Sequence, residues 1–371
     1  MRPPHRAGTP YRTGAPHGTD APRHAGAPWR HSGTLIAACL ALLAIAIASV
    51  AVGAVAIAPQ RVVQILAAGV HGAAGDAHHV VVWNVRLPRV LLSLSTGAGL
   101  ACAGVLMQAL FRNPLADPTL IGVSAGAALG AVAVIVLGVT WLHGATRLLG
   151  IWTLPAAAFV GALCASLLVF TLARRQGVID AGTMLLCGIA VNALAGACIG
   201  LMTYLASDDQ LRNLTFWSLG SLAAANWPAV AISIPLITAM IVVGLRLAPS
   251  LNALLLGEAE AMHLGVRVEW LKRGIVAVTA AAAGVAVAFS GIIGFIGLVA
   301  PHLARLIVGP DHRRMLPLAA LLGAGLLTLG DLVARTLVRP AELPLGILTA
   351  LLGAPFFLWL LRGRRSPGTS R

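Results

Sequence analysis

Long apolar runs recur along most of the chain, separated by short polar segments. A membrane-spanning helix needs about 20 apolar residues to cross a hydrocarbon core of roughly 30 Å. The pattern predicts ten spanning helices, at 34–57, 88–110, 118–139, 148–173, 181–206, 228–246, 274–290, 291–308, 316–338 and 344–361. Two of these runs meet at Ser290 and Gly291 with no polar segment between them.

The remaining segments are too polar to span a membrane. Residues 1–33 are rich in Pro, Gly, His and Arg, a composition typical of a disordered tail, and 362–371 form a second, basic tail. The stretch 207–227 predicts a short helix at the membrane surface, with Trp217 and Trp227 at the depth of the lipid headgroups. The domain organisation is therefore one transmembrane domain over 34–361 between two tails.

Composition supports this interpretation. Of the 371 residues, 58% are hydrophobic and only 10% are charged, which is too few charges for a water-soluble surface. The net charge of +14 does not indicate nucleic-acid binding, because the basic residues lie in loops and tails between apolar runs. The five cysteines are scattered within apolar runs, which indicates packing residues rather than a disulfide framework or a metal site. The sequence predicts an all-α polytopic membrane protein.

The basic residues predict the orientation of the chain. With ten spans, both termini lie on one side of the membrane, and that side carries 19 of the 26 Lys and Arg residues, against six on the other side. Positive charge is enriched in cytoplasmic loops. Both termini are therefore predicted to be cytoplasmic.

Small residues predict where helices pack closely. Gly122, Gly126 and Gly130 recur at every fourth position, and Gly97 and Ala101 begin a similar stripe. Such spacing lets two helix backbones approach each other in lipid. This feature is common among membrane proteins and indicates no particular substrate.

The sequence offers little enzymatic chemistry. Its single lysine, Lys272, is flanked by Leu271 and Arg273, so the Gly-Lys-Ser/Thr of a phosphate-binding loop is missing. Asp117 and Asp180 each precede a predicted helix and are interpreted as N-caps. No catalytic residues, cofactor site or metal ligands are predicted, and a membrane enzyme is the least favoured hypothesis.

One acidic residue lies deep in a predicted span. Asp331 is followed four residues later by Arg335, the spacing of an ion pair on a helix. Ionisable residues in membranes are functional candidates such as proton relays, so an ion-coupled secondary transporter that uses Asp331 is the alternative hypothesis. The milder interpretation is a locally paired arginine that reaches toward the outer surface.

The longest cytoplasmic connection, at about 247–273, contains the sequence GEAEAMHLG. Its composition predicts a short helix that ends at Gly265 and is too short to span a membrane. Such a helix either lies on the lipid surface or docks a cytoplasmic partner that supplies energy. The residues alone leave both interpretations open.

Three long motifs resemble the FecCD family, the membrane permeases of ABC importers for iron-siderophore complexes, haem and cobalamin. They are RLPRVLLSLSTGAGLACAGVLMQALFRNPLADPTLIGVSAGAALGA (86–131), GIIGFIGLVAPHLARLIVGPDHRRMLPLAALLGA (291–324) and AELPLGILTALLGAPFFLWLL (341–361). The resemblance covers about 35–361 and implies a ten-helix permease. It also implies residence in the bacterial cytoplasmic (inner) membrane and a role in iron transport, with an iron-siderophore complex or a related chelate as substrate.

The resemblance also implies partners and site residues. It implies two cytoplasmic ATPase subunits, an extracytoplasmic substrate-binding protein and a second permease, which is either a second copy of the chain or a related chain. Glu258, Ala261, Leu264 and Gly265 match the family's ATPase-coupling helix. Arg86, Arg89 and Arg335 match arginines that face outward toward acidic residues of the binding protein, which predicts a basic rim for docking.

Overall fold

The computed structural model describes residues 28–53, 57–69, 76–138, 143–175, 178–338 and 341–363. Residues 1–27 and 364–371, which make up most of the predicted tails at 1–33 and 362–371, lie outside the described residues. In chain order the elements are α1 (Pro28–Ala51), α2 (Pro59–Ala68), α3 (Ala77–Val80), the π-helix η1 (Val81–Arg86), α4 (Leu87–Leu110), the 3₁₀ helix η2 (Pro118–Ile121), α5 (Val123–Leu137), α6 (His143–Leu149), the 3₁₀ helix η3 (Gly150–Trp152), α7 (Thr153–Ala173), β1 (Arg174–Arg175), β2 (Val178–Ile179), α8 (Ala181–Leu205), α9 (Asp208–Ser218), α10 (Trp227–Leu254), α11 (Glu258–His263), α12 (Val268–Ser290), α13 (Ile296–Val308), α14 (His312–Leu337) and α15 (Leu345–Gly363).

The prediction of an all-helical membrane protein is confirmed. Among the described residues, seven helices are long and apolar enough to cross a membrane, and three shorter apolar helices are Val123–Leu137, Ile296–Val308 and Leu345–Leu358. Each predicted span overlaps one of these ten helices, and six of the helices extend beyond the predicted bounds. The short ladder between β1 and β2, in which Arg174 pairs with Ile179, closes the turn from α7 to α8.

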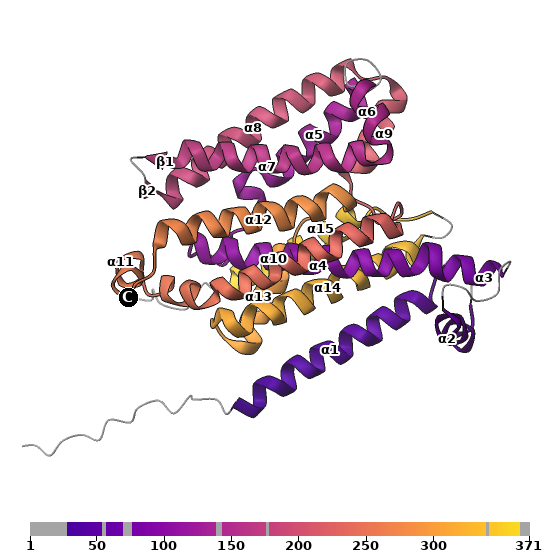
Figure 1. The fold of residues 1–371 in the computed structure, drawn as a ribbon, viewed down its shortest axis with the longest axis horizontal. Helices are drawn as coiled ribbons and strands as arrows, with labels where there is room; N and C mark the ends of the chain where they lie inside the picture. Colours follow the sequence, from indigo (N-terminus) through magenta and orange to yellow (C-terminus); the bar gives the residue numbers. More distant parts are fainter. Residues whose placement is uncertain are drawn as a thin grey trace, which may run out of the picture.

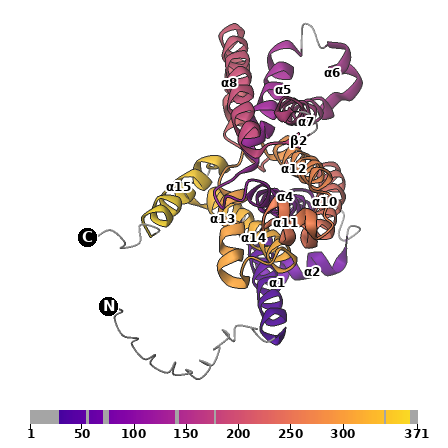
Figure 2. The ribbon, with the colours of Figure 1, turned by 90° about the vertical axis from the view of Figure 1, so that its left-hand side faces the viewer.

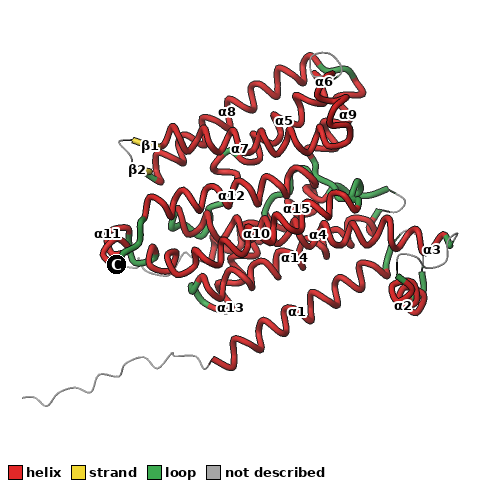
Figure 3. Tube along the Cα trace, in the orientation of Figure 1, coloured by secondary structure: helices red, strands yellow, loops and turns green. Residues whose placement is uncertain are grey.

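The helices form two groups around a buried pair (Figures 1 and 2). The buried pair is α4 and α12. Helix α4 runs through the middle and contacts α12 and the first group, which contains α10, α13 and α14. Helix α12 also contacts α7 of the second group, which contains α5, α7 and α8. The spanning parts of α4 and α12 are 78% and 72% buried, whereas α1 lies along α14 and is only 11% buried. Figure 3 shows that the chain is helical almost throughout and that loops lie mainly at the ends of the bundle.

Small residues bring these helices together. A Cβ atom added to Gly126 would overlap the carbonyl oxygen of Gly161, and one added to Gly130 would overlap that of Ala157, where α5 meets α7. Gly122 differs from the other two, because it has φ of 82° and precedes α5 in the left-handed conformation that glycine adopts without strain. Two members of the predicted stripe therefore lie at a helix contact, while the third shapes a turn.

Two predicted boundaries are wrong. The first turns of α1, from Pro28 to Gly33, are helical rather than part of the tail, which fits the tolerance of the first helical turn for proline. The predicted loop at 247–273 is shorter, because α10 continues to Leu254 and α12 begins at Val268. The extension of α10 keeps Ala248, Leu251 and Leu254 buried along one stripe, so packing sustains the helix beyond the apolar run.

The predicted short helices are present, and others were missed. The segment 207–227 forms α9, which begins with a capping box between Ser207 and Gln210, and GEAEAMHLG forms α11 with Gly265 at φ of 83°. Helix α2 was not predicted, because its ten residues are too few to span and only one face is apolar, with Val62 and Ile65 buried.

Candidate functional sites at the two ends of the bundle

Two clusters of charged side chains lie at opposite ends of the bundle. The arginine network, at the end where α1 finishes and α4 begins, consists of Arg86, Arg89, Asp331, Arg335 and Glu342. The lysine network, at the end that carries α11 and the β1–β2 turn, consists of Lys272, Glu258, Glu269 and the backbone of Ile179. Figure 1 shows that these two ends are separated by the length of the central helices.

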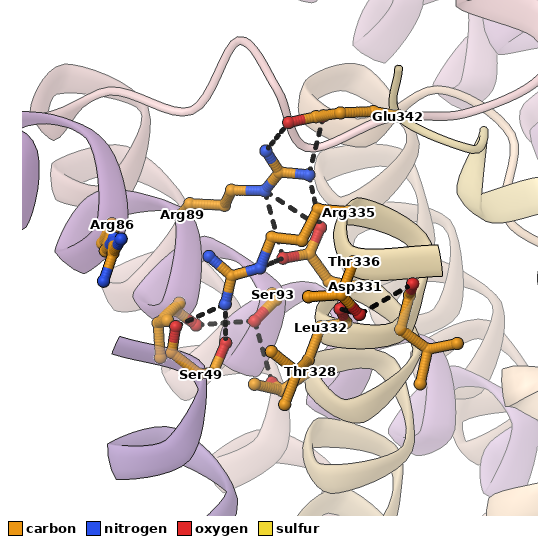
Figure 4. Close-up of polar contacts among 12 residues, drawn as sticks. Ser49, Arg86, Arg89, Ser93, Thr328, Asp331, Leu332, Arg335, Thr336 and Glu342 are labelled. Carbon is orange, nitrogen blue, oxygen red and sulfur yellow. Dashed lines mark hydrogen bonds and ion pairs between the residues drawn. The ribbon is translucent and has the colours of Figure 1, made fainter. Parts of the chain in front are cut away.

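Arg89 is the centre of the arginine network (Figure 4). Its Nε donates to both carboxylate oxygens of Asp331 at 3.0 Å, and its Nη2 donates to Asp331 Oδ1 at 2.9 Å. The two terminal nitrogens also donate to Glu342, at 2.9 and 3.0 Å. One guanidinium thus binds two carboxylates, each through two nitrogens, which is the geometry that its planar fork favours.

The other two arginines hold the end of α1. Arg86 Nη1 donates to the carbonyl oxygens of Val50 and Ala51, both at 2.8 Å, and Arg335 Nη2 donates to the carbonyl and hydroxyl oxygens of Ser49. Carbonyl groups at a helix C-terminus carry partial negative charge and lack partners within the helix. The three arginines carry one positive charge more than Asp331 and Glu342 balance. This charge lies against the C-terminus of α1.

The three arginines that were predicted to form a docking rim are buried in this structure. Arg86 is 3% exposed, and Arg89 and Arg335 are each 7% exposed, because all three lie beneath α1, α14 and the segment that carries Glu342. The predicted pairing of Asp331 with Arg335 is present but is the longer contact, at 3.7 Å, while Arg89 supplies the close hydrogen bonds. Glu342, whose side chain is 42% exposed, is the accessible charged group of this network.

The geometry argues against Asp331 as a proton carrier. Such a group must exchange its proton with water, whereas the Asp331 side chain is fully buried. Both of its carboxylate oxygens accept hydrogen bonds from Arg89. The arrangement links α4 to α14 through a buried ion pair.

The lysine network joins three elements. Lys272 Nζ, on a side chain only 2% exposed, donates to the carbonyl oxygen of Ile179 at 2.6 Å and to Glu258 Oε2 at 2.8 Å, and it lies 3.4 Å from Glu269 Oε1. The other oxygen of Glu269 accepts from the Ile179 N–H at 3.1 Å. Beside this network, Asp180 caps α8 by accepting from the Thr183 N–H, and this hydrogen bond lowers the pKa of Asp180.

The predicted coupling residues face different ways. Ala261 is fully buried against the bundle, and Glu258 is partly exposed and bonded to Lys272. Leu264 is 64% exposed, and Leu256 and Met262 are exposed as well. Exposed apolar side chains at α11 are therefore available to a partner, whereas Glu258 and Ala261 attach the helix to its own chain.

A cleft of about 570 Å³ opens between α7, α9, α10 and α12, at the same end as the arginine network. Aromatic side chains line it, namely Trp152, Phe216, Trp217 and Phe289. Two polar groups in the wall already have partners, since Asn226 caps α10 and Ser221 accepts from the Ala223 N–H. In the part of the chain that the structure describes, no group of three or more His, Cys, Asp or Glu residues is arranged to hold a metal ion.

Sequence reasoning missed Glu342, Glu269, Ser49 and the role of Lys272. Lys272 and Glu269 are three residues apart on a helix, a spacing visible in the sequence. Arg89 and Asp331 are 242 residues apart, so no local pattern indicates their pairing.

Comparison with known proteins agrees with this architecture. Residues 40–363 match the FecCD transport family. The chain is 49% identical over 285 residues to the hemin transport system permease protein HmuU of Yersinia pestis, covering 76% of this chain and 84% of that one. It is 43% identical over 289 residues to the cobalamin import system permease protein BtuC of Halobacterium salinarum, covering 78% and 75% of the two chains. A solved structure described as a metal-chelate type ABC transporter in an inward-facing conformation superposes with a TM-score of 0.78 at 32% identity, covering 90% of this chain and 99% of that one.

Proposed function

The chain belongs to the FecCD transport family, and from this premise we propose that it forms the membrane pathway through which an ATP-driven importer carries a large metal chelate. The chain is a multi-pass permease of the ABC transporter class and not an enzyme. Relatives named for hemin and for cobalamin support a chelate of this size as substrate. Haem is the first candidate, because the hemin permease is the more similar of the two, and an iron-siderophore complex and cobalamin are the others.

The partners follow from the same proposal. Two ATPase subunits bind at the α11 end, where the apolar side chains of Leu256, Met262 and Leu264 are exposed. A substrate-binding protein docks at the opposite end, and a second permease, either a copy of this chain or a related chain, completes the pathway. The distribution of basic residues supports a cytoplasmic position for the α11 end, and the family supports residence in the bacterial inner membrane.

The three arginines then lie beneath the docking surface rather than in it. Arg89 is occupied by Asp331 and Glu342, so an acidic side chain of a binding protein reaches Arg89 only by displacing Glu342. Arg86 and Arg335 hold the end of α1 from below. Their proposed role is to fix the shape of the surface on which the binding protein sits.

Reconstitution tests the proposal. The chain is inserted into proteoliposomes with its ATPase and binding protein, and uptake of hemin, cobalamin and a ferric siderophore is measured with ATP or a non-hydrolysable analogue. We expect uptake of one chelate that requires ATP hydrolysis and persists when ionophores remove ion gradients. Uptake that needs an ion gradient and no ATPase would instead support a secondary transporter.

A further inference from the structure

Lys272 has an unusual position for a lysine. It is the only lysine of the chain, and its side chain is 2% exposed. An ammonium group has three N–H donors, and three acceptors surround this one, namely the Ile179 carbonyl and the carboxylates of Glu258 and Glu269. A buried ammonium is tolerated only when its donors are satisfied, so the position of each acceptor is constrained by the others.

The three acceptors belong to three separate elements. Ile179 ends β2 in the turn that leads into α8, Glu258 is the first residue of α11, and Glu269 lies in the first turn of α12. The backbone of Ile179 is bonded on both sides, because its carbonyl accepts from Lys272 while its N–H donates to Glu269. Figure 1 shows these elements together at one end of the bundle.

Helix α11 has few other attachments. It is six residues long, its N-cap residue Gly257 makes no side-chain cap hydrogen bond, and Ala261 is its buried residue. The connection on its far side contains Gly265, which adopts a left-handed conformation. Among the described residues, the ion pair between Glu258 and Lys272 is the side-chain polar contact that joins α11 to the bundle.

We propose that Lys272 is a positioning residue that makes α11, the α7–α8 turn and the start of α12 move as one body. The inference rests on the proposed function, in which an ATPase docks on α11. A displacement of α11 then reaches α8 through Ile179 and reaches α12 through Lys272 itself. Helix α12 contacts both α4 and α7, so the displacement enters both groups of helices. Without the lysine, α11 follows the ATPase while the rest of the bundle stays behind.

The test compares three variants in the assembled complex with ATPase and binding protein. Lys272→Met keeps the length of the side chain and removes the charge. Glu269→Gln weakens the link between Lys272 and the Ile179 backbone without touching α11. Glu260→Gln is the matched control, because it removes a carboxylate from the same helix at an exposed position outside the network.

Two quantities are measured. The first is the amount of hemin transported per ATP hydrolysed, with cobalamin as the probe if hemin is not carried. The second is the distance between spin labels at Ala259 on α11 and Leu186 on α8, with and without ADP and vanadate, in a background lacking the native cysteines. Both label positions are exposed and lie outside the proposed docking residues.

We expect the wild-type and Glu260→Gln complexes to keep the label distance unchanged when the nucleotide is trapped. In Lys272→Met and Glu269→Gln we expect that distance to change with nucleotide, and transport per ATP to fall by about fivefold or more while hydrolysis continues. If Lys272→Met fails to assemble, Glu269→Gln decides by the same two readouts. Unchanged transport per ATP and unchanged label distances in a variant complex that hydrolyses ATP would overturn the inference. Failure of the proposed function is seen separately, as a wild-type chain that forms no ATP-hydrolysing complex.

Discussion

The arginine network and the lysine network solve the same problem with different side chains. Each attaches a poorly buried helix to the bundle, since α1 is held through Ser49, Val50 and Ala51, and α11 is held through Glu258. Arginine has a rigid planar fork that binds two carboxylates in fixed orientations, whereas lysine is a point charge on a flexible stem. The first end is therefore fixed by paired hydrogen bonds of defined geometry, whereas the second is held by one ammonium group that, in our proposal, keeps three elements together as one body.

The two networks also differ in how far they are shielded from water. The Asp331 side chain is fully buried, while the side chains of Glu258 and Glu269 are 36% and 31% exposed. Water at the partly exposed carboxylates screens their charge and replaces lost partners. Removing the close partner of Asp331 should therefore cost more stability than removing the charge of Glu258 or Glu269.

The largest effect is expected for Arg89→Ala. This change leaves the buried Asp331 carboxylate without its close partner, which costs about 3–5 kcal/mol of unfolding free energy. Thermal unfolding in detergent measures the loss. Arg61→Ala is the matched control, because it breaks an ion pair with Asp76 at a side chain that is 46% exposed, and it should cost at most about 1 kcal/mol. Replacing both Arg89 and Asp331 by apolar residues should restore much of the stability, and a double variant as unstable as Arg89→Ala alone would contradict this account.

A smaller effect is expected for Glu258→Gln. Lys272 keeps two of its three acceptors and Glu258 is partly exposed, so the loss should be about 1 kcal/mol. Glu260→Gln should leave stability unchanged. Thermal unfolding and amide hydrogen exchange of α11 provide the measurements, with faster exchange expected only in Glu258→Gln. Equal exchange in the two variants would show that the ion pair does not hold α11.

Glu342→Gln addresses docking at the arginine end. The change removes the carboxylate that occupies Nη1 and Nη2 of Arg89, so an acidic side chain of the binding protein meets less competition. We expect tighter binding of the binding protein, by about 0.2–1 kcal/mol, and a steeper dependence on salt. Affinity measured across a salt series is the test. Unchanged affinity and an unchanged salt slope would place the docking contacts away from Arg89.

Local patterns in the sequence predicted what depends on neighbouring residues. Apolar runs predicted the helices, and Asp180 before α8 and Gly265 after α11 were recognised from the chemistry of helix ends. Asp117 was likewise predicted as a cap, although it caps a 3₁₀ helix rather than the start of α5.

Contacts between distant segments could not be predicted in this way. Arg335 was paired with Asp331 because the two are one turn apart, whereas the closer partner, Arg89, comes from a different helix. The burial of the three arginines has the same cause, since the end of α1 and Glu342, which cover them, are distant in sequence and no local pattern indicates this cover. Tertiary packing, which leaves no local periodicity, decides both features.

The smallest effect is expected for Asp180→Asn, beside the lysine network. The Thr183 N–H donates to the Asp180 carboxylate and lowers the pKa of Asp180 below its usual value of 3.8, and the charge of Lys272 contributes in the same direction. Because the pKa in the folded state is depressed, the carboxylate stabilises α8 fully above about pH 4 and loses this contribution as the pH falls through the folded value. The difference in thermal midpoint between wild type and Asp180→Asn should therefore be constant from pH 5 to 8 and shrink only at lower pH. When both proteins also carry Lys272→Met, the pH at which their difference in thermal midpoint shrinks should move upward, toward the usual pKa of an aspartate. If it does not move, the Lys272 charge does not act on Asp180, and the link between the lysine network and α8 runs through the Ile179 backbone alone.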